Sequence, residues 1–268
     1  MVLTPLTKKQ LEEIFDDAAL EVIDYFLEKT ILLQPEILDG QDELPIQIPK
    51  EHIEQWFVQA IHAKPVGAGS YPVDIILGDI FGADVKMLSC KVDKDNKLKV
   101  GAQSGETSLA QKFKSTGASL DDLFNNGKYE EILDGWKDIL FNKIEGIKET
   151  NPKLKIYYFF FLRAGKTFYL CGCEVDHNKL CDTVVLDKSN KTNVHVGNFI
   201  DPEYGKITIY KAKKRMELRL YPSHWYSKEN VIEFTTSSEI VPVDLRKMAL
   251  NGTLNDYKRK QFSKFLSE

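Results

Sequence analysis

The sequence predicts an α/β (α+β) fold in which a mixed β-sheet is flanked by helices. Two observations predict it. Apolar residues recur three or four positions apart near the N-terminus and over residues 129–148, as in helices that bury one side. Residues 154–162 form a nearly uninterrupted apolar and aromatic run, as expected of a central strand covered on both faces.

The expected elements follow in chain order. Thr7 to Gln10 has the form of a capping box and opens a long helix whose apolar stripe continues to Phe26. A second amphipathic helix covers residues 51–61. Two short apolar runs, 73–77 and 83–88, are separated by a glycine-containing turn and predict a β-hairpin.

Further along, Ser104 or Thr107 is expected to cap a helix that carries Leu109, Ala110 and Phe113 inward. After the helix at 129–148 and the central strand, strands dominate from Lys166 to about Phe234, and two short helices are expected near Asp244 and Tyr257.

The chain has 268 residues, enough to bury a substantial core, and no linker or internal repeat divides it. We therefore expect a single domain over 1–268. Its parts would be a helical N-terminal region of about 1–65, a core of about 66–175 and a strand-rich region of about 176–268.

The hairpin at 73–88 carries charged residues inside apolar runs. Side chains alternate along a strand, so Asp84 and Lys86 face one side of it. If the two strands pair, Asp74 approaches Asp84, and two carboxylates converge on a volume suited to Mg²⁺. The alternative is a solvated Asp–Lys pair, with Asp74 accepting a turn hydrogen bond, but charged residues seldom lie in such runs without a compensating partner.

The residues Pro72, Val73 and Asp74, followed by Asp84, Val85 and Lys86, resemble the motif of the PD-(D/E)XK nuclease superfamily. One departure is Val73, which stands between the proline and the acid. The resemblance implies a restriction-endonuclease-like core and a Mg²⁺-dependent type II endodeoxyribonuclease that cuts double-stranded DNA as a homodimer.

The same resemblance implies the roles of individual residues. Asp74, Asp84 and the carbonyl of Val85 would hold the metal, while Lys86 would orient or activate the attacking water. Gln103, Glu106 and Ser108, which follow the lysine strand, would lie near the scissile phosphate. Glu54 or Glu51 of the preceding helix would supply a further acid, although a solvent-facing helical glutamate is the commoner case.

Charge and hydropathy limit the possible partners. The net charge of −4 argues against a protein that coats nucleic acid, so any DNA contact must come from local basic clusters. A strongly basic turn joins two alternating strands between residues 206 and 221 and either contacts phosphates or is solvated. Its cationic residues are Lys211, Lys213, Lys214, Arg215 and Arg219.

Cys171, Cys173, His177 and Cys181 lie within eleven residues, a composition that can bind zinc. Their spacing lacks the usual two-residue knuckle, so reduced, metal-free thiols are the preferred interpretation.

No segment is long and apolar enough to span a membrane, and the N-terminus lacks a signal-peptide profile, so we expect a cytoplasmic protein without a membrane partner. Two alternatives to the restriction enzyme stay open. One is a DNA-repair nuclease of the same superfamily, and the other is a catalytically silent nucleic-acid-binding or interaction protein.

Overall fold

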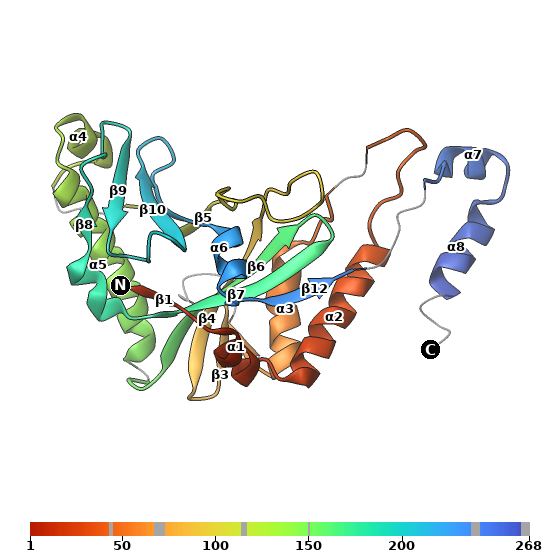
Figure 1. The fold of residues 1–268 in the computed structure, drawn as a ribbon, viewed down its shortest axis with the longest axis horizontal. Coiled ribbons are helices and arrows are strands. Elements are labelled where there is room, and N and C mark those ends of the chain that lie inside the picture. The colour runs from red at the N-terminus through yellow and green to blue at the C-terminus, as the bar shows by residue number, and fades with distance from the viewer. Residues whose placement is uncertain (43–44, 67–72, 114–116, 150, 237–241, 264–268) are drawn as a thin grey trace.

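A computed structural model describes residues 1–42, 45–66, 73–113, 117–149, 151–236 and 242–263 of the chain (Figure 1). Pro72, predicted as part of the acidic motif, lies outside the described residues, as does the side chain of Glu51. The described residues form two β-sheets with helices around them, so the predicted mixed α/β class is confirmed.

The larger sheet has seven strands in the order β1-β7-β6-β4-β3-β2, and β12 also pairs with β7. Its strands are β1 (Leu3–Pro5), β2 (Lys64–Pro65), β3 (Ile75–Leu77), β4 (Phe81–Ser89), β6 (Lys155–Ala164), β7 (Thr167–Val175) and β12 (Ile232–Thr235). β4 and β6 are parallel, whereas the other neighbours are antiparallel, so the sheet is mixed.

The smaller sheet is antiparallel, with five strands in the order β5-β11-β10-β9-β8. They are β5 (Thr107–Gln111), β8 (Val184–Val185), β9 (Asn193–Gly197), β10 (Gly205–Tyr210) and β11 (Arg215–Leu220). β10 and β11 are the hairpin predicted at 206–221, and Met216, Leu218 and Leu220 are buried on one face of it as expected.

Helices cover both faces of the larger sheet (Figure 1). They are α1 (Lys8–Ile14), α2 (Asp17–Leu32), α3 (Lys50–Ile61), α4 (Leu120–Asn125), α5 (Tyr129–Lys148), the 3₁₀ helix η1 (His177–Asp182), α6 (Pro222–Ser227), α7 (Leu245–Leu250) and α8 (Leu254–Ser263). No helix within the described ranges is long and apolar enough to cross a membrane.

The central strand β6 divides the hydrophobic core in two, because its side chains alternate between the faces of the sheet. Tyr157, Phe159 and Phe161 pack with α1, α2 and α3. Phe160 and its neighbours on the opposite face pack with α5 and with the smaller sheet. The prediction that this strand is covered on both sides is confirmed.

Two expected helices differ from the structure. The first predicted helix is broken at Phe15, because the Asp16 carboxylate accepts a hydrogen bond from Ala19 N–H at 2.9 Å and starts α2. The helix expected near 107–113 is wrong, because residues 107–111 form β5 and pair with β11. Long-range pairing therefore overrides the local capping signal.

The C-terminal helices α7 and α8 are where the sequence predicted them, and they lie at one end of the molecule, apart from both sheets (Figure 1). Val243 N–H donates to the carbonyl of Ile37 at 2.8 Å, and the Tyr257 hydroxyl donates to Glu36 Oε1 at 3.1 Å. These contacts join the C-terminal helices to the loop after α2.

Candidate active site

Asp74 directly precedes β3 and lies beside the middle of β4. Its N–H donates to the carbonyl of Ala83 at 2.9 Å, as a strand residue would. Its Oδ2 then accepts the Val85 N–H at 2.8 Å, so a carboxylate takes the place of the next strand residue along this edge of β4. These two hydrogen bonds hold the Asp74 side chain next to Asp84.

The structure brings together the two predicted carboxylates and the predicted lysine. The ammonium of Lys86 lies 3.6 Å from Asp74 Oδ2 and forms an ion pair with Asp84 Oδ1. A side-chain hydrogen bond also joins Asp84 to Asp74. The three groups come from two neighbouring strands whose register pairs Ile75 with Ala83.

Asp84 is only 4% exposed, and burial raises its pKa from 3.8 to about 7. The positive charges of Lys86 and Lys143 oppose this rise, and the neighbouring Asp74 adds to it. Lys143 reaches Asp84 from α5, with its Nζ 3.9 Å from Asp84 Oδ2. Tyr158, opposite Asp84 on β6, has its own pKa raised by burial and by the charge of Asp84.

Sequence analysis missed Lys143 and Tyr158. Lys143 directly precedes the buried Ile144 in the helix, a local signal for a residue beside the core. Tyr158 becomes a neighbour of Asp84 only through the parallel register of β4 and β6, for which the sequence carries no local signal.

Lys86 remains strongly protonated in this setting. Burial acts to lower its pKa, but the carboxylates of Asp84 and Asp74 outweigh burial, and the net pKa is raised. The charge of Glu54 on α3 raises it as well. The predicted additional acid Glu54 therefore lies close enough to act on the lysine.

Asp74 and Asp84 are the carboxylates in this site that could hold a Mg²⁺ ion. This ion is commonly held by one or two carboxylates, and waters or substrate phosphates complete its coordination. The N–H of Val85 points at Asp74, and in an extended strand a residue's N–H and carbonyl face the same edge, so the Val85 carbonyl is directed to that edge too. Among the described residues, no group of three or more His, Cys, Asp or Glu side chains is arranged to hold a metal ion.

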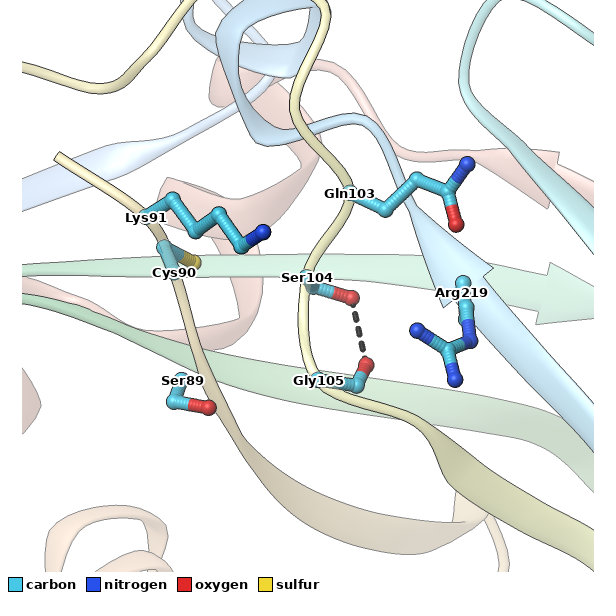
Figure 2. A pocket seen from close by; sticks show the side chains of 7 residues that line it. All are labelled: Ser89, Cys90, Lys91, Gln103, Ser104, Gly105 and Arg219. Atoms are coloured by element: carbon cyan, nitrogen blue, oxygen red, sulfur yellow. Dashed lines mark hydrogen bonds between the residues drawn. The ribbon is translucent and has the colours of Figure 1, made fainter.

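A polar cleft of about 480 Å³ opens beyond the end of β4 (Figure 2). Residues 89–91 line one side of it, residues 103–105 line another, and Arg219 of β11 reaches it from the smaller sheet. None of these lining residues is acidic, whereas Lys91 and Arg219 are cationic. Sequence analysis did not predict this cleft, because its three segments are far apart in the chain.

No protein-family model matches this chain, and neither curated proteins nor solved structures give a match to it.

The structure separates the three residues predicted after the lysine strand. Gln103 lines the cleft. Glu106 forms ion pairs with Lys213 and Arg219, which lower the pKa of its carboxyl group. Ser108 is on β5 and donates to the carbonyl of Ala110 at 3.1 Å. Among the described parts of the chain, none of the three forms a hydrogen bond or ion pair with Asp84 or Lys86.

The basic turn between β10 and β11 is largely neutralised by neighbouring groups. Lys213 pairs with Glu106 and lies 3.3 Å from Glu217, while Lys214 lies 3.1 Å from Asp121. Lys211 donates to Asn125 Oδ1 at 2.5 Å. Arg215 is exposed at the start of β11. Internal ion pairs of this kind weaken the case for the turn as a phosphate-binding surface.

The cysteine and histidine side chains predicted as a possible zinc site do not converge. Cys171 and Cys173 are fully buried on one face of β7, and burial raises the pKa of both thiols. His177 is paired with Glu145 of α5, and the exposed Cys181 bonds to the carbonyl of Asn178. The two buried thiols are therefore core residues.

Proposed function

We propose that this protein is a Mg²⁺-dependent endonuclease that hydrolyses phosphodiester bonds in double-stranded DNA. The convergence of Asp74, Asp84 and Lys86 at one edge of β4 carries the proposal. This arrangement lowers the stability of the fold, because the Asp84 carboxyl group is almost fully buried, and burial disfavours its ionised form. Ionisable groups whose pKa is shifted in this way are common at functional sites, which agrees with carboxylates that hold a cation.

Asp74, Asp84 and the Val85 carbonyl would hold the ion. When bound, Mg²⁺ supplies positive charge that polarises a phosphoryl oxygen and favours attack by water. Lys86 contributes a positively charged hydrogen-bond donor. Because its pKa is raised, it keeps its proton at neutral pH and stabilises negative charge that develops on the phosphate. A lysine that keeps its proton is suited to stabilising charge or orienting the attacking water, and less suited to removing a proton from that water.

Glu54 and Lys143 would act on the charges of this site. Glu54 favours the protonated form of Lys86. Lys143 approaches the other oxygen of Asp84 and favours its ionised form. Glu54 comes from α3 and Lys143 from α5, and these two helices pack on opposite faces of the larger sheet.

The motif resemblance extends the proposal to a type II restriction endonuclease acting in the cytoplasm. Cleavage of both strands of a palindromic site matches a homodimer with two-fold symmetry. A repair nuclease of the same superfamily would share the chemistry but would cut at structures or lesions rather than at a fixed sequence.

The test is incubation of mixed-sequence plasmid and phage DNA with the purified protein, with and without Mg²⁺. Asp84→Ala and Lys86→Ala are the test variants, and Lys179→Ala on η1, an exposed lysine, is the control. We expect Mg²⁺-dependent discrete fragments from the wild type and the control, with neither variant active.

Cleavage without fixed ends would favour the repair enzyme. DNA binding without any cleavage, unaffected by Lys86→Ala, would favour the silent binding protein. Cleavage that survives both substitutions would overturn the site assignment.

A further inference from the structure

We propose that the cleft beyond the end of β4 binds a backbone phosphate of the same DNA strand that is cut at Asp74, Asp84 and Lys86. This inference rests on the proposed nuclease function and adds a second contact point for the substrate. Its ligand is one phosphodiester group of the DNA backbone, a few nucleotides from the scissile bond.

The cleft and the acidic site share one edge of β4. The Val85 N–H points to the Asp74 side chain, and four residues further on the Ser89 carbonyl accepts the Gly105 N–H at 2.7 Å. Residues an even number apart on a strand direct their backbone groups to the same edge. Asp74 and the segment at Gly105 are therefore successive neighbours along the edge of β4 opposite β6.

The separation suits a continuous strand of DNA. Lys86 and Ser89 are three residues apart, about 10 Å along an extended strand. Successive phosphates of one B-DNA strand rise by about 3.4 Å along the helix axis and lie further apart than this in space, so a few nucleotides of one strand cover the distance between the lysine and the cleft.

The lining of the cleft is suited to an anion with several acceptor oxygens. Figure 2 shows the Lys91 ammonium, the Gln103 carboxamide and the Arg219 guanidinium around its opening. Ser104 is oriented away from this role, because its hydroxyl donates to the Gly105 carbonyl at 2.7 Å and accepts the Leu220 N–H at 3.0 Å. The donors that remain are therefore mainly cationic or amide groups, which are common partners of DNA phosphates.

Arg219 is held in place by an ion pair, but not all of its N–H groups have hydrogen-bond partners. One end of its guanidinium pairs with Glu106, whereas its Nε is buried and has no hydrogen-bond partner among the described atoms. Buried donors are nearly always paired in folded proteins, so this N–H is expected to take an acceptor from water or from a bound ligand. The fork of an arginine suits a phosphate, because separate N–H groups can reach different oxygens.

Positive charge also accumulates around Arg219. Lys206 is its register partner on β10, and burial lowers the pKa of Lys206, with the charges of Arg219 and Lys188 lowering it further. An anion that approaches Lys206 and Arg219 would offset this repulsion between their positive charges. Glu106 compensates Arg219 only in part, because it is shared with Lys213.

The test uses Arg219→Gln and Lys91→Gln, with Arg259→Gln on α8 as the matched control. Lys91 is exposed, so its variant keeps the proposal testable if Arg219→Gln perturbs folding. Binding of a fluorescent duplex is measured by anisotropy in EDTA over a range of salt concentrations. We expect each variant to lose about tenfold or more in affinity and to reduce the salt slope by about one, which corresponds to one lost phosphate contact.

Steady-state cleavage in Mg²⁺ gives a second readout. Both cleft variants should raise KM and leave kcat nearly unchanged, whereas Lys86→Ala should lower kcat. Titration with inorganic phosphate, followed by NMR, separates the two sources of the ligand. Weak phosphate binding that is lost in Arg219→Gln, together with weaker duplex binding, supports the inference.

The two proposals can fail separately. A wild type that cuts DNA, with both cleft variants matching Arg259→Gln in affinity, salt slope and KM, overturns the cleft inference alone. Phosphate binding at Arg219 without any change in duplex affinity also overturns it, because the cleft would then serve a small ligand. A wild type that neither binds nor cuts DNA instead overturns the nuclease proposal.

Discussion

Asp84→Asn should stabilise the metal-free protein at alkaline pH. Asp84 has a pKa of about 7 in the folded chain and 3.8 without its surroundings, because it is buried. Between these values the folded state holds a proton that the unfolded chain releases, so the free energy of unfolding falls as pH rises through this window. Above pH 7 the folded protein carries the ionised group at a cost of about 4 kcal/mol.

Asparagine has a similar shape but no carboxyl proton to lose. Relative to the variant, the wild type should therefore lose about 3 kcal/mol of unfolding free energy between about pH 5 and about pH 8.5, because part of the cost is already present at pH 5. The assay is urea unfolding in EDTA at both pH values. Asp134→Asn is the control, since this exposed aspartate of α5 has 65% of its side chain accessible and should show no such pH dependence relative to the wild type.

Wild type and Asp84→Asn are compared at the same pH. The titration of all other groups, which the two proteins share, then cancels from the difference in their free energies of unfolding. A stability difference that is the same at both pH values would refute the reasoning. If the variant instead became less stable relative to the wild type as pH rises, the pH dependence would have the opposite sign, and this result would refute the reasoning more strongly.

Four further outcomes are expected. Mg²⁺ binding measured by calorimetry should weaken about tenfold per pH unit below 7 in the wild type, because a proton competes for Asp84; a flat profile would count against Asp84 as a ligand. Glu54→Gln should slow cleavage about tenfold without changing duplex affinity, since it acts on the charge of Lys86, and an unchanged rate would remove it from the site. Trp136→Ala should cost about 3–5 kcal/mol in urea unfolding, because the indole is fully buried, and a loss below about 1 kcal/mol would contradict its role in the core. Cys181→Ser should leave the unfolding midpoint unchanged, because this exposed thiol does not meet the other cysteines; stoichiometric zinc in metal analysis of the purified protein would restore the zinc interpretation.

Local patterns predicted much of the fold correctly. The helix at 129–148, the apolar strand β6 and the hairpin of β3 and β4 are where the sequence placed them. Each has a periodicity that extends over several residues and agrees with its burial. The errors arose where a local signal competed with another interaction, as at Asp16, which caps a new helix, and at residues 107–111, which β11 recruits into a sheet.

The sequence by itself determined which charged residues lie inside apolar strands and that Asp84 and Lys86 share a face, because side-chain alternation is a local property of the backbone. Only the tertiary structure decided which other side chains lie next to Asp84 and Lys86. The Asp74 carboxylate takes a strand position beside Val85, and Lys143 and Tyr158 approach Asp84 from α5 and β6. The cleft likewise joins β4 to Arg219 across more than a hundred residues of chain. Such contacts depend on how sheets and helices pack over long sequence separations, and no short window of sequence contains that information.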